Sequence, residues 1–219
     1  MSDTTEKNEI RLLYKVRNTV LTTLKDRGYD IPSGSSNMSP EDFKSLYEQN
    51  RHHLYFPNML PVNLKEEYKK GGGVLVYFEP SDKFDKHILK SHMIQLNKEY
   101  PNLDKLFFVL KTYGIEKKQK LNTFVRLELS EHPNVEVLEN IYPFDFMKNI
   151  MVPECYLLSS EEKEAVIKMM DTPLHNFPKF ESTDPIPTRF GAKVGDMFHI
   201  KRYGGLELSY RVVVKPGSG

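Results

Sequence analysis

The stretch TDPIPTRFGAKVGDMFHIKRYGGLELSYRVVV, residues 183–214, decides the fold of the C-terminal part of the chain. Two runs rich in apolar residues, 197–202 and 206–214, flank the turn Tyr203-Gly204-Gly205, which is the pattern of a β-hairpin. Ahead of them, Asp184-Pro185 is typical of a turn or a helix start, because proline at the first helical position gives up no useful donor. We therefore predict a turn or helix followed by a hairpin.

Two glycines lie between these elements and bracket a lysine. Gly191 and Gly195 are expected to adopt the positive φ angles that L-residues avoid, and so to form the turns that lead into the hairpin. This structural role explains both glycines without a binding function.

Upstream of this stretch, the composition of the sequence changes at about Met147. Val152-Pro153 is followed by Ser159-Ser160-Glu161-Glu162, a hydroxyl cap with acids in the first helical turn, and then by several prolines. These features predict a separate small α+β domain over residues 148–215. The last residues, 216–219, are typical of a linker or a frayed end and are left out of the fold as a tail.

The N-terminal part begins with helical patterns. Apolar residues between Glu6 and Arg27 recur on one helix face, and Gly28 follows where a left-handed residue ends a helix. Ser39-Pro40 predicts the start of a second helix that runs to about Asn50. Residues 51–70 show no clear period, and we expect them to be irregular.

An alternation of strand and helix patterns follows. Short apolar runs at 74–78 and 106–110 predict buried strands, and 135–137 is a third strand candidate. Helical patterns at 85–100 and 115–129 lie between the strands. Because strands separated by helices usually pair in parallel, residues 1–147 are predicted to form an α/β domain.

Composition limits the function. The 31 basic and 30 acidic residues nearly balance, so contact with nucleic acid must be local rather than driven by overall charge. The single cysteine, Cys155, excludes an internal disulfide and a multi-thiolate zinc site, and no two of the seven histidines have i, i+4 spacing. No apolar run approaches the ~18 residues of a membrane span. We expect an intracellular protein with no bound metal or cofactor, no membrane and no small-molecule substrate.

Several motifs occur at fixed spacing along the chain. They are Arg11-Leu12, Lys25-Asp26-Arg27-Gly28-Tyr29, Glu41-Asp42-Phe43-Lys44, Phe177-Pro178-Lys179-Phe180, Asp184-Pro185, Gly191-Ala192-Lys193-Val194-Gly195, Arg202 and Ser209-Tyr210-Arg211. Through these motifs the C-terminal part resembles the shared fifth subunit of eukaryotic RNA polymerases I, II and III, and is similar to the shorter archaeal RNA polymerase counterpart of that subunit. The N-terminal part resembles the opening of the longer eukaryotic form, and the resemblance spans Glu9 to Val214.

The resemblance implies a non-catalytic subunit of a DNA-directed RNA polymerase. Its N-terminal α/β domain would be a jaw, with a restriction-endonuclease-like layer, beside downstream duplex DNA. The C-terminal domain would dock on the largest polymerase subunit, with other subunits as further partners, while magnesium and zinc would belong to those other chains. The implied assembly residues are Asp184, Pro185, Gly191, Lys193, Gly195, Arg202, Tyr210 and Arg211.

A lysine-rich segment is the predicted DNA contact. Lys111, Lys117, Lys118 and Lys120 form the densest basic patch and could neutralise phosphates without reading sequence. A solvated helix face explains the same charges. The patch therefore leaves both interpretations open.

Departures from the family pattern indicate a divergent member. They include Cys155, Pro187 and a short hairpin loop at 203–205. A cellular source would place the protein in the nucleus. A large DNA virus would place it in the host cytoplasm, a viral factory or the virion.

Two other functions remain as alternatives. A free transcription adaptor could have kept the fold outside the polymerase. A metal-dependent nuclease could use acids such as Glu79, Asp82 and Asp85 with the Glu116-Lys117-Lys118 segment, since paired carboxylates can hold catalytic metals. These acids lie among lysines in loop-like segments, as solvated residues do, so the nuclease is the less favoured interpretation.

Overall fold

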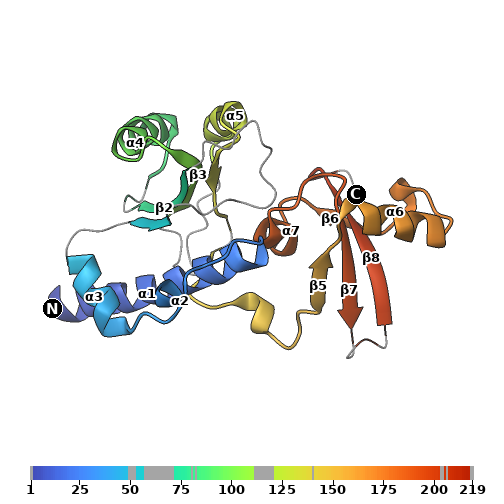
Figure 1. Ribbon diagram of the computed structural model, residues 1–219, viewed down its shortest axis with the longest axis horizontal. Helices are drawn as coiled ribbons and strands as arrows, with labels where there is room; N and C mark the ends of the chain where they lie inside the picture. Colours follow the sequence, from blue (N-terminus) through green and yellow to red (C-terminus); the bar gives the residue numbers. More distant parts are fainter. Residues whose placement is uncertain are drawn as a thin grey trace. The chain divides into compact units, whose positions relative to one another are not determined.

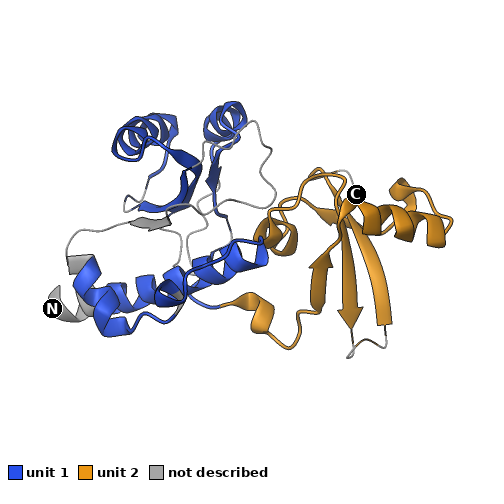
Figure 2. Ribbon diagram, viewed as in Figure 1, with its two compact units in different colours: residues 1–144 blue, residues 145–219 orange. Residues whose placement is uncertain are grey.

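The computed structural model describes residues 2–48, 53–56, 72–79, 81, 83–110, 121–139, 141–202, 205 and 207–217. It divides into two compact units, which span Met1–Phe144 and Asp145–Gly219 (Figure 2). The first unit ends three residues before the end predicted at residue 147. Each unit has its own sheet and its own hydrophobic core, and each is described by itself.

The first unit opens with a long amphipathic helix, α1 (Ser2–Asp26). Val16, Val20 and Leu24 are fully buried along one face. The helix ends at Asp26. Two residues later, Gly28 has a φ of 86°, the left-handed conformation that the sequence predicted, and Gly28 N donates to the Lys25 carbonyl at 2.9 Å. The predicted first helix is confirmed.

Two short helices follow, α2 (Ser33–Ser36) and α3 (Pro40–Glu48). The Ser39 hydroxyl accepts a hydrogen bond from Asp42 N at 3.1 Å, so the predicted capping serine starts α3. α3 packs on α1 through Tyr14 and Phe43, whose ring centroids are 5.7 Å apart. The α1–α3 pair forms one edge of the unit (Figure 1).

A four-stranded sheet forms the centre of the unit, in the order β1-β2-β3-β4. β2 pairs in parallel with β3, and β3 with β4, while β1 is antiparallel to β2. The predicted parallel pairing is confirmed. β1 lies in a segment predicted to be irregular, and that prediction is wrong for its four residues. The strands span β1 (His53–Phe56), β2 (Gly73–Glu79), β3 (Leu103–Leu110) and β4 (Val135–Val137).

Helices cover both faces of this sheet. α4 (Lys86–Glu99) and α5 (Thr123–Glu131) lie on one face, where Leu75, Leu106 and Phe108 are buried. α1 lies on the other, where Val76 and Phe107 pack (Figure 1). α5 begins at Thr123, capped by the Asn122 side chain, rather than at the predicted Ile115. The predicted residues 115–120 of that helix lie outside the described residues.

The second unit is a smaller α+β fold with a four-stranded sheet in the order β5-β7-β8-β6. The predicted hairpin is β7–β8, and β5 and β6 flank it. The α6 start at Ser159 has a full capping box with Glu162, as the sequence predicted. The elements are η2 (Phe146–Lys148), β5 (Glu154–Leu157), α6 (Ser160–Met169), η3 (Leu174–Asn176), β6 (Lys179–Glu181), α7 (Pro185–Phe190), β7 (Met197–Arg202) and β8 (Glu207–Val214).

The two faces of this second sheet are covered differently. On one face, which we call the α7 face, Phe198 and Val213 pack against Ile186 and Phe190 of α7. On the other, the α6 face, Met197 and Val212 pack with Val166 of α6. Strand residues alternate between these faces, so the position of each side chain follows from its number.

Candidate assembly surface

The helix start predicted at Asp184-Pro185 is present, with one difference. Pro185 is the first residue of α7, as expected, and the Asp184 carbonyl accepts the Thr188 N–H at 3.1 Å. The Asp184 carboxylate accepts from Glu181 N at 3.1 Å, and not from the helix. It therefore ties β6 to the start of α7 instead of capping that helix.

The glycine turns are also present. Gly191 ends α7 with φ at 65°, and Gly195 has φ at 96°. Between them, Lys193 N donates to the Asp196 carboxylate at 2.7 Å, which closes the turn and leaves the lysine exposed. Gly191 and Gly195 thus shape the backbone, and Lys193 is an exposed side chain of this turn.

The remaining three predicted assembly residues do not cluster. Arg211 lies on the α7 face with its guanidinium 4.9 Å from the centre of the Phe180 ring. Arg202 lies on the same face at the end of β7, 3.9 Å from Glu207. Tyr210 lies on the opposite α6 face. The sequence motif that joins Tyr210 and Arg211 therefore serves two surfaces, because neighbouring residues in a strand point to opposite sides.

The structure places Tyr210 in a row with two further rings, which the sequence motifs did not indicate. Tyr156 of β5 pairs with His199 of β7, and His199 pairs with Tyr210 of β8. His199 stacks on Tyr210 with centroids 5.1 Å apart and planes at 23°, and lies 6.3 Å from the Tyr156 ring. We call Tyr156, His199 and Tyr210 the aromatic row. Alternation along each strand predicts which residues share a face of that strand. It reveals the row only when the register between β5, β7 and β8 is also known.

The aromatic row is open where α6 stops covering the sheet. Tyr156 is 45% exposed, and Leu208 beside the row is 56% exposed. The Lys201 ammonium lies over the Tyr156 ring at 4.8 Å from its centre. His199 Nε2 is buried, and no hydrogen-bond partner is found for it within the part of the chain that the structure describes. An exposed tyrosine beside a half-buried tyrosine and an exposed leucine is typical of a protein interface, where aromatic residues are enriched.

Cys155 is a packing residue on the α7 face. Its side chain is buried, its thiol donates to the Pro153 carbonyl, and burial raises its pKa to about 11. A thiol with a raised pKa is a poor nucleophile and a poor metal ligand at neutral pH. This residue therefore contributes to the core rather than to chemistry.

The acids considered for a nuclease have structural partners. Glu79 is almost fully buried, accepts from Ser81 N and Oγ at 3.0 and 2.6 Å, and pairs with His92 at 2.8 Å. The Asp85 carboxylate caps α4 by accepting from His87 N and Ile88 N. Asp82 and residues 116–118 lie outside the described residues.

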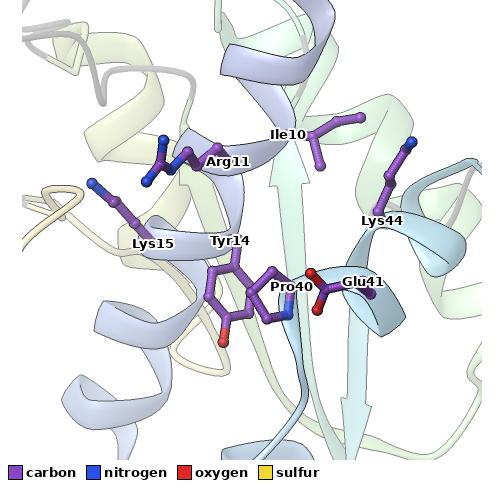
Figure 3. A pocket seen from close by; sticks show the side chains of 7 residues that line it. All are labelled: Ile10, Arg11, Tyr14, Lys15, Pro40, Glu41 and Lys44. Carbon is purple, nitrogen blue, oxygen red and sulfur yellow. The ribbon is translucent and has the colours of Figure 1, made fainter.

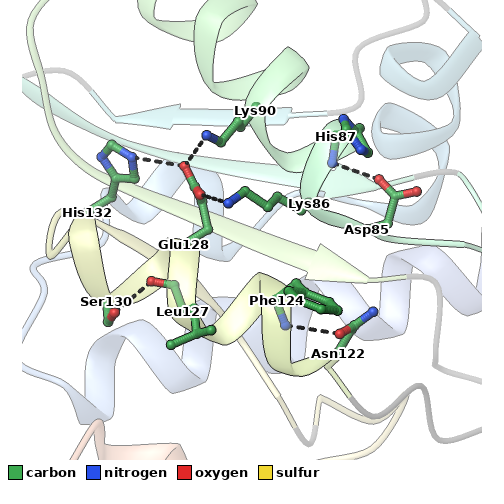
Figure 4. Close-up of polar contacts among 10 residues, drawn as sticks. All are labelled: Asp85, Lys86, His87, Lys90, Asn122, Phe124, Leu127, Glu128, Ser130 and His132. Atoms are coloured by element: carbon green, nitrogen blue, oxygen red, sulfur yellow. Dashed lines mark hydrogen bonds and ion pairs between the residues drawn. The ribbon is translucent and has the colours of Figure 1, made fainter.

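Two lysines of α4 are paired with one acid of α5 (Figure 4). Lys86 and Lys90 of α4 each lie 2.9 Å from the Glu128 carboxylate of α5, and His132 lies 3.5 Å from it. Hydrogen bonds from Lys86 and then Lys90 lower the pKa of Glu128 to about 2. This cluster holds two helices together.

The four lysines predicted to contact DNA, Lys111, Lys117, Lys118 and Lys120, lie outside the described residues. Over the described ranges, no three His, Cys, Asp or Glu side chains are grouped as metal ligands. Nor does any described helix combine the length and apolarity needed to cross a membrane.

These features define a class of protein. An α/β unit whose buried acids serve structural roles is joined to a small α+β unit with an open aromatic sheet face. That combination describes a component of an assembly, in which one unit offers a surface for a protein partner.

Comparisons with known proteins identify the assembly. Residues 7–96 match the family model "RNA polymerase Rpb5, N-terminal domain", and residues 144–213 match "RNA polymerase Rpb5, C-terminal domain". The chain belongs to the Rpb5 family of DNA-directed RNA polymerase subunits, which are non-catalytic. The family resemblance and the non-catalytic role expected from the sequence are confirmed.

Similar proteins come from archaea, plants and animals. The DNA-directed RNA polymerase subunit Rpo5 of Pyrococcus horikoshii is 37% identical over 75 residues, which cover 33% of this chain and 92% of that protein. The DNA-directed RNA polymerases IV and V subunit 5B of Arabidopsis thaliana is 22% identical, covering 88% of this chain and 84% of its own length. The DNA-directed RNA polymerases I, II, and III subunit RPABC1 of Caenorhabditis elegans is 23% identical, covering 92% and 95%.

Proposed function

We propose that this subunit joins the polymerase through its second unit, which docks on the largest subunit, while the first unit forms part of the jaw beside downstream DNA. The open aromatic row is the observation that carries the proposal. Family membership makes a polymerase subunit the partner, and the row offers the tyrosine-rich surface that buried interfaces favour.

The residues expected at the interface then divide into two roles. Lys193, Arg202 and Tyr210 carry side chains with exposed surface and would contact the partner. Asp184, Pro185, Gly191 and Gly195 would act indirectly, by fixing α7 and the turn that presents Lys193. Arg211 would support this surface through its contact with Phe180.

Substitutions in the aromatic row test the docking. Tyr156→Ala combined with Tyr210→Ala should weaken binding of the full chain to the recombinant largest subunit by about tenfold or more, since tyrosine anchors at interface centres commonly contribute ~2 kcal/mol. Phe124→Ala is the matched control, because Phe124 is 64% exposed on α5 of the first unit. Equal affinity of the tyrosine variant and the control would rule out the row as the docking surface.

Recovery of partners separates a core subunit from a free adaptor. A core subunit should co-purify in stoichiometric amounts with other polymerase subunits and resist salt. An adaptor should be recovered below stoichiometry and be removed by salt. Mass spectrometry of proteins bound to the tagged chain distinguishes these outcomes.

The jaw part of the proposal rests on the lysines of residues 111–120 and on family membership. Replacing Lys111, Lys117, Lys118 and Lys120 by Ala in the assembled polymerase should weaken its hold on duplex DNA downstream. The slope of log affinity against log salt should fall by about one for each phosphate that no longer has a lysine partner. For a cellular polymerase we propose that the chain works in the nucleus, and for a viral one in the host cytoplasm, viral factory or virion.

A further inference from the structure

A hollow between α1 and α3 in the first unit shares no residue with the aromatic row or with the Glu128 cluster (Figure 3). Its volume is about 540 Å³, within the ~300–1,000 Å³ typical of ligand pockets. Ile10, Tyr14 and Pro40 give it carbon-rich walls. The hollow can therefore accept an apolar side chain of a partner.

Its rim is mainly cationic. Arg11 and Lys15 are exposed and stand one helical turn apart on α1, extending on the same side in Figure 3. Lys44 on α3 adds a third cation, while Glu41 is the single acid among the residues that line the hollow. Asp42, its neighbour on α3, accepts from the Ser39 hydroxyl. The lining thus carries three positive charges against one negative charge.

We infer that this hollow, which we call the α1–α3 groove, binds an acidic protein segment that inserts one apolar anchor residue. The apolar walls favour an apolar anchor residue, because moving apolar surface out of water stabilises the complex. The cations select acidic neighbours and speed the encounter. The inference concerns the first unit and does not depend on docking of the second.

Duplex DNA is the rival occupant and fits less well. Its backbone would match Arg11, Lys15 and Lys44, but phosphates and sugars have no apolar group to fill the space beside Ile10 and Pro40. Affinity for DNA would come from charge alone. Binding of an acidic protein segment should therefore depend on an apolar side chain, whereas binding of DNA should depend on charge alone.

The test uses the full chain and two short synthetic peptides, both fluorescent. One has a single Phe among Asp and Glu residues, and the other has Ser in place of Phe. The Phe peptide should bind with saturation, and the Ser peptide about tenfold or more weakly. Equal binding of the two peptides would overturn the anchor, and no binding by either would overturn the inference.

Variants locate the binding. Arg11→Glu with Lys15→Glu should weaken the Phe peptide by about tenfold, because two rim charges are reversed. Both side chains are exposed, so an unchanged melting curve is expected and shows that the variant folds. Lys98→Glu, an exposed residue of α4, is the matched control and should change affinity by less than about twofold.

Competition with duplex DNA decides the class of occupant. DNA should displace the Phe peptide only weakly, and its own affinity should not respond to the Arg11 and Lys15 reversals more than to Lys98→Glu. DNA that binds more tightly than the Phe peptide, and loses that affinity with the same two reversals, would show that the groove is a nucleic-acid surface instead.

Discussion

Two buried arginines of the first unit each hold two elements together. Arg17 on α1 is 1% exposed and donates to the Ser35 carbonyl of α2 at 2.8 Å. Arg27 after α1 pairs with Glu136 of β4 at 2.7 Å. Burial opposes ionisation of Glu136, but Arg27 and Lys105 outweigh it and lower the pKa of this carboxyl. Such contacts fix how α1 meets α2 and how the residues after α1 meet the sheet, which apolar packing alone defines less sharply.

Two glycines provide a test of backbone conformation. A methyl group at Gly195 or at Gly34 would meet no atom within 4 Å, so neither substitution to alanine creates a steric clash. Gly195 has φ at 96°, which L-residues avoid, while Gly34 lies in α2. Gly195→Ala should therefore destabilise the second unit by about 1–2 kcal/mol, and Gly34→Ala should be neutral or slightly stabilising. Calorimetry of both variants checks this, and equal effects would contradict the role of φ.

The Glu128 cluster predicts a pH dependence. The pKa of Glu128 is lowered from 4.5 to about 2 in the folded chain, so the cluster stabilises fully above pH 4.5. That stability is lost as the pH falls from 4.5 towards 2. Glu128→Gln removes the ion pairs with Lys86 and Lys90, so its melting temperature should be lower at neutral pH and fall less steeply in acid.

Thermal melting at a series of pH values measures this difference. Glu131→Gln is the matched control, because Glu131 is an exposed acid on the same helix. It should reproduce the steep acid loss of the unchanged chain. Parallel pH curves for Glu128→Gln and the unchanged chain would show that the cluster does not stabilise the fold.

At the scale of elements, the helices and strands that could be predicted from the sequence are mainly those with a capping motif or a long apolar run. Helix starts at Ser39 and Ser159, and strands with long apolar runs, need no tertiary information. The sequence patterns missed β1, β5 and β6, which have three or four residues each. Segments that short show little period, and β4, which is equally short, was predicted because two valines alternate with Glu136. The missed strands form where a longer neighbour offers unpaired backbone groups.

The candidate site was predicted unevenly for a related reason. Turn residues such as Gly191 and Gly195 are local, and their conformations were predicted correctly. The aromatic row was missed because Tyr156 and Tyr210 come together only through the pairing of β5, β7 and β8. A motif in sequence order does not reveal which side chains share a face when the strand order is not sequential.

The start of α6 gives a prediction at this scale. The Ser159 hydroxyl accepts from Glu162 N at 3.2 Å, and the Glu162 carboxylate accepts from Ser159 N at 2.8 Å. Ser159→Ala should destabilise the second unit by about 1 kcal/mol, since it leaves a helix donor without its cap. Ser159→Thr keeps the hydroxyl and should restore most of the loss. Chemical denaturation measures both, and equal losses would rule out a capping role.

At the scale of the whole molecule, the two units have separate cores. Buried clusters form around β2 and β3 in the first unit and around β7 and β8 in the second, and each cluster draws all its residues from one unit. A core that is complete within one segment allows that segment to fold alone. One family model matches residues 144–213 by itself, and these residues nearly coincide with the second unit.

We therefore predict that residues 145–219 fold without the rest of the chain and retain the docking function. A domain of this size has about 3–5 kcal/mol of stability, so it should unfold in one cooperative transition well above room temperature. The affinity of this fragment for the largest polymerase subunit should be within about threefold of the affinity of the full chain, because the fragment contains both the aromatic row and the Lys193 turn. The fragment 1–144 should not bind that subunit but should still bind the Phe peptide. Melting without cooperativity would contradict separate folding of the second unit, and transfer of the largest-subunit affinity to the 1–144 fragment would contradict docking through the second unit.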